Sequence, residues 1–128
     1  MDNALLLQKA KSVMDNAYVK YSNFKVGAAL LAKSGKIYTG CNIENASYGA
    51  TICAERVAFT KAISEGEKEF EAIAIVSSSG DYTYPCGICR QFMAEFGIDL
   101  KLIFSNGKGT KEYYLKELLP NAFTEFET

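Results

Sequence analysis

Residues 70–92 read FEAIAIVSSSGDYTYPCGICRQF. This stretch begins with an apolar run that is expected in the core and ends with a pair of cysteines that is expected in a functional site. The near-continuous apolar run from Phe70 to Ser78 has the pattern of a strand that is covered on both faces. After a polar loop, apolar residues at helical spacing predict a helix from Cys86 to Phe96, with Gly97 as its C-cap. A buried strand followed by a helix is typical of a sheet that is covered by helices.

The rest of the chain alternates between the periodicity of helices and that of strands. Apolar spacing predicts further helices over residues 3–19, 52–64 and 116–119 and further strands over residues 25–32, 36–41, 100–104 and 111–115. This order predicts an α/β fold, a three-layer α/β/α sandwich in which helices cover both faces of a central mixed sheet of about five strands. The length of 128 residues suits a single domain, residues 1–128.

Composition and charge argue against several classes of function. The apolar fraction of 48% and the charged fraction of 23% are those of an ordinary soluble globular protein. The net charge is −1 with no basic stripe, which disfavours binding to nucleic acid. The N-terminal sequence MDNALLLQKAKSV lacks the features of a signal peptide, and no apolar stretch reaches the roughly 18 residues of a membrane span. We therefore expect a cytoplasmic protein with no membrane partner.

Three cysteines have the spacing of a metal site. Cys86 and Cys89 form a CxxC pair at the start of a predicted helix, which places two sulfurs one turn apart, and Cys53 lies at the start of the preceding helix. Both helices are expected to be crossovers that begin at the same edge of the sheet, which would bring the three thiols together. Three thiolates suit Zn²⁺ and leave one position open for water, the arrangement of catalytic zinc. Glu55, two residues after Cys53, is the expected proton carrier.

The sequence contains no histidine, so a metal site must rely on thiolates and proton transfer on a carboxylate. Three thiolates on a divalent metal leave a net negative charge, which weakens the metal as a Lewis acid. Arg56, one helical turn beyond Cys53, is expected to offset this charge by donating hydrogen bonds to the sulfurs, and Arg90 is a second candidate. The alternative is a surface ion pair, which is the stronger interpretation for Arg90.

Four stretches of the sequence resemble one enzyme family, over nearly the whole chain. They are YSNFKVGAALL at residues 21–31, GCNIENASYGATICAER at residues 40–56, PCGICRQ at residues 85–91 and ELLPNAF at residues 117–123. The CxE and PCxxC pair matches the zinc deaminase signature, in a version with cysteine where other members carry histidine. Together the four stretches resemble the small homotetrameric cytidine deaminases of pyrimidine nucleoside salvage.

The resemblance implies zinc-dependent hydrolytic deamination of cytidine and deoxycytidine to uridine and deoxyuridine, with release of ammonia. It implies that Cys53, Cys86 and Cys89 hold the zinc. Glu55 would take a proton from the attacking water, deliver it to the adjacent ring nitrogen and then help the amine to leave. Arg56 is the better of the two arginine candidates by the same resemblance.

The substrate contacts are likewise implied by the resemblance. Asn42 and Glu44 would hydrogen-bond the ribose hydroxyls, and Phe24 would pack on the nucleoside. Backbone groups near Ala54 and Cys86 would contact the base. Considered without the family, Asn42 and Glu44 could simply cap their loop through Asx turns, and Phe24 could be a core residue.

A homotetramer with shared active sites is the last implication. In the family, the position that matches Phe123 reaches into a neighbour's site and packs beside the base, and the loop around Tyr48 crosses an interface. A short chain has little length to spare for closing a lid over a nucleoside, which favours such sharing. The alternative is that Phe123 anchors the C-terminus on its own domain.

Two other functions stay open from the residues alone. Cys41 could complete a closed site with four cysteine ligands, which would make the protein a structural zinc module without catalysis. Against this, Cys41 and Cys53 are not a close pair and Cys41 lies in a predicted strand, so a small buried hydrophobe is the simpler interpretation. The other function is deamination of bases in RNA or DNA, which the absence of a basic surface disfavours.

Overall fold

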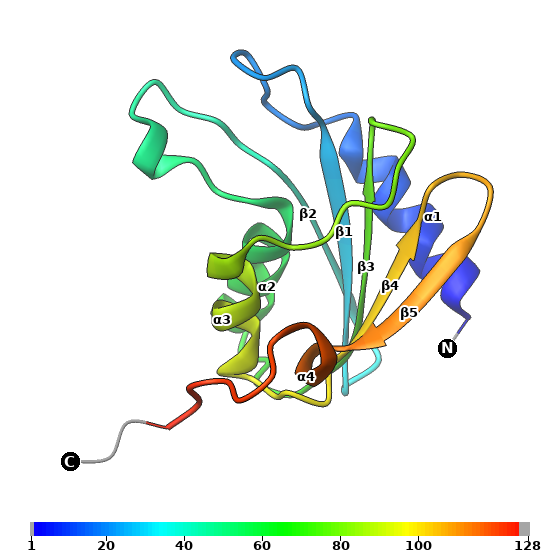
Figure 1. Cartoon of the computed structure of the whole chain (residues 1–128), viewed down its shortest axis with the longest axis vertical. Coiled ribbons are helices and arrows are strands. Elements are labelled where there is room, and N and C mark those ends of the chain that lie inside the picture. Colours follow the sequence, from blue (N-terminus) through cyan, green and yellow to red (C-terminus); the bar gives the residue numbers. More distant parts are fainter. Residues whose placement is uncertain (1, 126–128) are drawn as a thin grey trace.

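Within residues 2–125, which the computed structural model describes, five strands form one mixed sheet (Figure 1). They span Val26–Ala32 (β1), Ile37–Cys41 (β2), Phe70–Ser77 (β3), Lys101–Ser105 (β4) and Thr110–Tyr114 (β5). Their order across the sheet is β2-β1-β3-β4-β5. The pairing of β3 with β4 is parallel, and the other three pairings are antiparallel. The predicted hairpin of the first two strands is confirmed.

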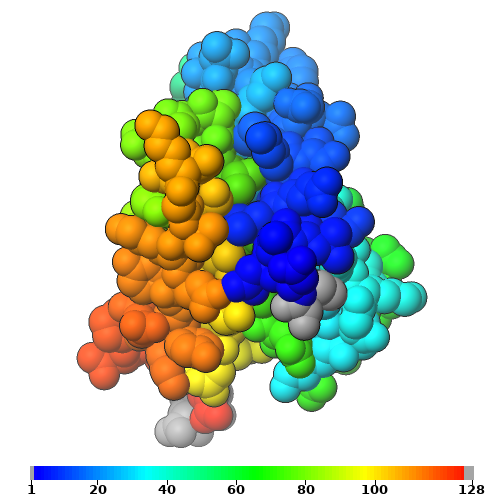
Figure 2. All heavy atoms as spheres, turned by 90° about the vertical axis from the view of Figure 1, so that its right-hand side faces the viewer, coloured from blue at the N-terminus to red at the C-terminus, as the bar shows by residue number. Residues whose placement is uncertain are grey.

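Helices cover both faces of this sheet (Figure 1). They span Asn3–Met14 (α1), Ala54–Ser64 (α2), Gly87–Ala94 (α3) and Leu115–Leu118 (α4). α1 covers one face, where Figure 2 shows it in blue beside the β4–β5 hairpin in orange, and the other three helices pack on the opposite face. The predicted three-layer α/β/α sandwich is confirmed. In the described part of the chain, no helix is both long enough and apolar enough to cross a membrane.

β3 runs through the middle of the sheet and contributes to both cores. Ile73 and Ile75 are fully buried in the cluster that includes α2 and α3, whereas Ala74 is fully buried in the cluster beneath α1. This alternation follows from the strand geometry, in which successive side chains point to opposite faces. The sequence-based prediction of a strand covered on both sides is confirmed.

The directions of the strands bring the starts of α2 and α3 together. Because β1 is antiparallel to both β2 and β3, the strands β2, β3 and β4 all run in the same direction. α2 links β2 to β3 and α3 links β3 to β4, so both crossovers move across the sheet in the same direction and lie on the same face. Each helix begins beyond the carboxyl end of a strand. Their N-termini therefore lie at one edge of the sheet, as predicted.

The first helix is shorter than its apolar pattern predicts. It ends at Met14 rather than at Val19. The chain turns after Met14, and the backbone of Tyr18 then pairs with the loop that follows β2, accepting from Glu44 N and donating to Asn42 O. This pairing joins segments far apart in the sequence, so the local periodicity gives no sign of it.

Two further boundaries differ from the prediction. α2 begins at Ala54 rather than at Ile52, because the backbone of Ile52 exchanges two hydrogen bonds of 3.0 Å with that of Ile43. The C-cap of α3 is Glu95 rather than Gly97, because the chain tightens there into hydrogen bonds that span three residues. The remaining boundaries agree with the prediction to within two residues.

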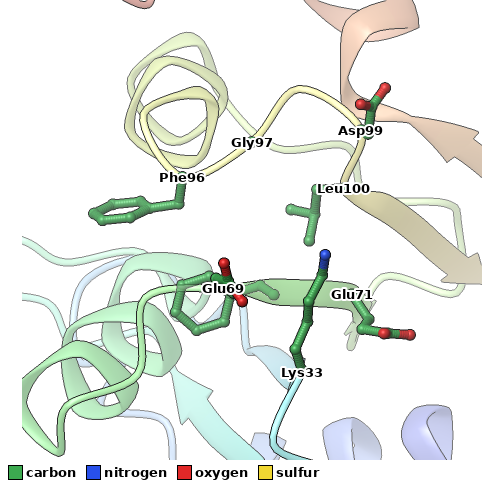
Figure 3. Close-up of a pocket in the computed structure, with 8 residues that line it drawn as sticks. Lys33, Glu69, Glu71, Phe96, Gly97, Asp99 and Leu100 are labelled. Carbon is green, nitrogen blue, oxygen red and sulfur yellow. The ribbon is translucent and has the colours of Figure 1, made fainter.

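A pocket of about 410 Å³ lies at the opposite end of the sheet from the starts of α2 and α3 (Figure 3). It is formed by the turn after β1, the start of β3 and the connection from α3 to β4. Its charged lining consists of Lys33, Glu69, Glu71 and Asp99. None of the cysteines lines it, so it is separate from the site that the sequence predicts.

Candidate active site

Three sulfur atoms meet where α2 and α3 begin. The Sγ atoms of Cys53, Cys86 and Cys89 all lie within 4.8 Å of one another, and those of Cys53 and Cys86 are 4.0 Å apart. Cys53 comes from the start of α2, and the other two come from the start of α3. The crossover topology therefore brings together thiols that are distant in the sequence, as predicted.

Two of these thiols stand at helix N-caps without capping their own helices. Cys53 and Cys86 are the N-cap residues of α2 and α3, with extended backbone angles, and neither side chain caps its own helix. Each sulfur is therefore available for another partner. The unpaired N–H groups and the dipole of a helix N-terminus favour thiolate over thiol, which suits a metal ligand.

The geometry and chemistry of the cluster fit zinc. Tetrahedral zinc with Zn–S bonds of about 2.3 Å holds its sulfurs about 3.8 Å apart. The 4.0 Å separation of Cys53 and Cys86 is close to this value. Thiolates are soft ligands that select zinc over hard cations such as magnesium. Cys89 is buried and Cys86 is exposed, so the cluster is accessible from one side, and three ligands leave a fourth position open.

Arg56 supplies a positive charge to the sulfur cluster. Its Nη2 atom donates a hydrogen bond of 3.6 Å to Cys53 Sγ, and its Nε atom is buried without a hydrogen-bond partner in the described part of the chain. Hydrogen bonds from Cys89 and from Arg56 lower the pKa of Cys53. In return, the bond to Cys53 raises the pKa of the Arg56 guanidinium. The contact that the sequence suggested is present, and its effect on catalysis stays a prediction.

Glu55 is buried next to the cluster, with only 5% of its surface exposed. It is the second residue of α2, two residues after the N-cap Cys53. Burial raises the pKa of the Glu55 carboxyl to about 7, and the negative charge of Cys53 adds to this effect. A carboxyl group with a pKa near neutrality can both accept and donate a proton at physiological pH. This is the property that the proposed proton carrier needs.

Arg90 has a different environment from the one expected. Its Nε atom donates to Pro85 O and its Nη1 atom donates to Leu118 O, both at 2.7 Å. In the described part of the chain it contacts none of the sulfurs and forms no ion pair. Neither the sulfur contact nor the surface ion pair expected for this residue is found among residues 2–125. Both acceptors are backbone carbonyl groups, so the pattern of charged residues in the sequence could not indicate them. Leu118 is also distant from Arg90 in the chain.

Cys41 lies apart from the metal cluster. It is the last residue of β2 and is half-buried, and the ligand cluster found among residues 2–125 consists of Cys53, Cys86 and Cys89 without it. Burial raises the pKa of the Cys41 thiol, which keeps it protonated at neutral pH. The structure therefore lends no support to a site with four cysteine ligands.

Asn42 and Glu44, the expected ribose contacts, both bond to the segment that leads into β1 and includes its first residue. Asn42 Oδ1 accepts from Val26 N at 2.9 Å and Asn42 Nδ2 donates to Phe24 O at 2.8 Å. Glu44 Oε1 accepts from Tyr21 N at 2.9 Å. The two side chains thus brace the segment in which Phe24 lies, and these contacts differ from the Asx turns within their own loop that the alternative interpretation proposed. Their contacts to substrate stay predictions.

Ser22 is a member of this region to which the sequence gave no role. Its hydroxyl donates to Glu44 Oε2 and accepts from Phe24 N, and its backbone N–H donates to Glu44 Oε1 at 3.1 Å. The side-chain bond from Ser22 holds the pKa of the Glu44 carboxyl below its ordinary value. Ser22 therefore links two residues that are expected to contact substrate. Only its place in the stretch YSNFKVGAALL could have drawn attention to it.

The expected apolar contacts are exposed in the single chain. Phe24 is 38% exposed, Tyr48 is 75% exposed and Phe123 is 63% exposed. The ring of Tyr48 makes an edge contact with Tyr21 at a centroid distance of 5.8 Å. Core packing, the alternative for Phe24, does not describe a side chain this exposed. Ala54 is the fully buried first residue of α2.

A cluster of three thiols at two helix N-termini, with a buried carboxyl beside it, is the arrangement of zinc-dependent deaminases. Comparison with known proteins narrows this class. The sequence model described as the cytidine and deoxycytidylate deaminase zinc-binding region matches residues 1–105. The chain belongs to the cytidine deaminase family, whose members are hydrolases that act on C–N bonds.

Individual relatives are similar over almost their whole length. A cytidine deaminase from Halalkalibacterium halodurans is 50% identical over 126 residues, which cover 97% of this chain and 96% of the relative. Among solved structures, a cytidine deaminase from Burkholderia pseudomallei has a TM-score of 0.91 and 44% identity, covering 96% of this chain and 100% of that one. A cytidine deaminase from Mycobacterium tuberculosis has a TM-score of 0.87 and 39% identity, covering 98% and 99%.

Proposed function

We propose that this protein is a zinc-dependent cytidine deaminase that converts cytidine and deoxycytidine to uridine and deoxyuridine with release of ammonia. The observation that carries the proposal is the cluster of three sulfurs within 4.8 Å of one another, with buried Glu55 two residues from one of them. The relatives from Halalkalibacterium halodurans and Burkholderia pseudomallei are named cytidine deaminases, which supports the choice of substrate.

Cys53, Cys86 and Cys89 would hold the zinc. Zinc bound there would act as the Lewis acid that makes water acidic enough to attack at neutral pH. Glu55 then moves the protons. It accepts one proton as water adds to the amino-bearing ring carbon, and it delivers that proton to the adjacent ring nitrogen. A second transfer through Glu55 protonates the amine, the C–N bond breaks and ammonia leaves.

The substrate contacts require that residues already engaged in the loop can bind a sugar as well. A carboxylate offers about four acceptor sites. Glu44 uses three of them, for Tyr21 N, Ser22 N and Ser22 Oγ, so one remains for a ribose hydroxyl. Asn42 uses one of its two amide hydrogens and one of the two lone pairs on Oδ1. Bracing the loop and binding the sugar are therefore compatible roles, and Phe24 beside them would pack on the nucleoside.

We further propose a homotetramer with shared active sites, built from single-domain subunits of residues 1–128, that acts in cytoplasmic pyrimidine salvage. The exposure of Tyr48 and Phe123 supports the assembly, because aromatic side chains are enriched where one protein surface covers another. A neighbour's Phe123 would then close the nucleoside site, which is otherwise open on the side of Cys86.

The test combines two measurements on the purified protein, its zinc content and the release of ammonia from cytidine. We expect about one zinc per chain, as expected for one catalytic site, together with ammonia release. A protein that holds zinc and releases no ammonia from cytidine or deoxycytidine would contradict the proposed activity and favour a structural zinc module. Ammonia release from cytosine bases in single-stranded DNA or RNA, without activity on the nucleosides, would favour a nucleic-acid deaminase.

A further inference from the structure

Arg90 donates hydrogen bonds to the backbone on both sides of Cys86, one of the three proposed zinc ligands. Its backbone N–H donates to Cys86 O at 2.9 Å, and its side-chain Nε donates to Pro85 O at 2.7 Å. The two carbonyl groups that flank the Cys86 backbone N–H and Cα are therefore both held by the same residue. Pro85 is buried, and as a proline it lacks an N–H group with which to anchor itself.

Cys86 is the ligand that most needs such support. Cys89 is buried within α3, and Cys53 receives a hydrogen bond from Arg56. Cys86 is exposed, and its side chain makes no cap bond to its own helix. Because the Pro85 carbonyl and the Cys86 N–H belong to the same planar peptide unit, fixing that carbonyl limits the rotation that would move the Cys86 sulfur.

The same guanidinium also donates to the last residue of α4. Its Nη1 atom donates to Leu118 O at 2.7 Å, at the last residue of α4, where a helix leaves carbonyl groups without partners. The next residue of α3, Gln91, donates through Nε2 to Phe123 O at 2.7 Å. α3 thus holds the C-terminal segment at two points, and α4 lies beside α3 in the structure (Figure 1).

We propose that Arg90 is a positioning residue that holds Cys86 in place for zinc and ties this ligand to the C-terminal segment. Its planar guanidinium is suited to this role because Nε and Nη1 donate to two carbonyls in fixed directions, which the single ammonium group of lysine cannot reproduce. The charge assists both hydrogen bonds. The inference rests on the zinc site of the proposed function, but it concerns how tightly the zinc is held rather than which substrate is used.

The test measures the rate at which zinc passes from the loaded protein to a chromogenic chelator. Arg90→Met keeps the length of the side chain and removes all donors, and loss of a residue that supports metal ligands typically weakens metal binding about 10- to 100-fold. We expect zinc release to accelerate by a factor in this range. Arg90→Lys, which keeps the charge, should release zinc faster than wild type and more slowly than Arg90→Met.

A matched control separates the ligand from the tail. Gln91→Leu removes the neighbouring bond to Phe123 O while leaving the Pro85 bond intact, so its zinc release should match that of wild type. In Co²⁺-loaded protein, Arg90→Met should also change the thiolate-to-cobalt absorption bands, which report ligand geometry, and Gln91→Leu should not. This readout does not depend on catalysis.

Three outcomes would overturn the inference. Equal zinc release from wild type and Arg90→Met would show that Arg90 does not hold the ligand. If the methionine variant fails to fold, equal zinc release from wild type and Arg90→Lys would show the same. Equal acceleration in Gln91→Leu would assign the effect to the tail. These results leave the proposed function intact, whereas a wild-type protein that binds no zinc would overturn the proposed function and this inference together.

Discussion

Gly40 of β2 lies so close to Ala54 of α2 that a methyl group on Gly40 would stand 2.5 Å from the carbonyl oxygen of Ala54. It would stand equally close to the backbone nitrogen of Ala58. The first turn of α2, which carries Glu55 between these two alanines, therefore rests directly on the strand. The position of α2 therefore depends on the absence of a side chain at Gly40.

Gly40→Ala should consequently destabilise the protein. The contact is with backbone atoms, which cannot rotate away, so α2 must shift, and overpacking of this kind typically costs about 1–3 kcal/mol. Urea denaturation would measure the free energy of unfolding. Gly49→Ala is a suitable control, because a methyl group there meets nothing within 4 Å, and its stability should match wild type. Equal stability of Gly40→Ala and Gly49→Ala would contradict the close seating of α2.

Glu55→Gln should separate proton transfer from metal binding. Loss of a general acid–base group typically lowers turnover about 10²- to 10⁴-fold, and kcat should fall at least this far. Zinc content should not change, because Glu55 is not among the clustered ligand atoms. Steady-state kinetics and metal analysis on the same preparation would test both statements. Loss of zinc from this variant would mean that Glu55 has been given the wrong role.

The raised pKa of Glu55 also predicts how stability depends on pH. With a folded-state pKa of about 7 and an ordinary value of 4.5, the folded protein binds the Glu55 proton more tightly than the unfolded protein does. Stability therefore falls as the pH rises from 4.5 toward 7, where the buried carboxyl loses its proton. Zinc-free Glu55→Gln protein has no buried carboxyl to ionise at this position. Its free energy of unfolding relative to that of zinc-free wild type should therefore rise across that interval. Denaturation at pH 4.5 and at pH 7.5 would detect the difference, and a constant difference would contradict it.

The sheet and the metal cluster could be predicted because their signals are local. The apolar run of β3 and the CxxC pair at the start of α3 each lie within a few residues, and the crossover rule then places Cys53 near Cys86. The contacts that escaped prediction join residues far apart in the chain. Arg90 bonds to Leu118, and no pattern around either residue indicates the other. The same holds for Tyr18, whose pairing with the loop after β2 ends the first helix early.

Arg56→Ala should move the pH profile of catalysis. Without the guanidinium, the negative charge of the three thiolates is less well offset, so a water at the metal becomes less acidic. We expect the lower-pH limb of kcat/KM to shift to higher pH, with activity at neutral pH reduced. Arg56→Lys keeps the charge but lacks the directional fork, so its profile should lie between the two. A profile for Arg56→Ala that superimposes on wild type would restrict Arg56 to a structural role.

Glu44→Ala should raise KM for cytidine while leaving zinc content close to that of wild type. The proposed hydroxyl contact is lost, whereas the cluster of sulfurs is untouched. Ser22→Ala should change KM in the same direction by a smaller factor, because it removes the hydroxyl that orients Glu44 and leaves the carboxylate in place. If both variants bind cytidine as wild type does, the two residues serve only to brace the loop.

The proposal of shared sites can be tested by mixing two impaired variants. Glu55→Ala and Phe123→Ala proteins are unfolded together and refolded with zinc, so that their chains assort into mixed tetramers. If a site combines Glu55 of one chain with Phe123 of a neighbour, roughly one site in four in a random mixture is intact. Activity should then exceed the average of the separately refolded variants.

Phe123→Ala can reduce activity in either of two ways, and the mixture distinguishes them. If Phe123 only anchors the tail of its own chain, where Gln91 donates to its carbonyl, every chain in the mixture keeps one defect and no site is restored. The matched control mixes Glu55→Ala protein with protein that carries both Glu55→Ala and Phe123→Ala. No chain in this mixture has an intact Glu55, so activity should not increase. Mixed tetramers confirmed by mass, without increased activity, would place Phe123 in its own subunit and remove the need for assembly in catalysis.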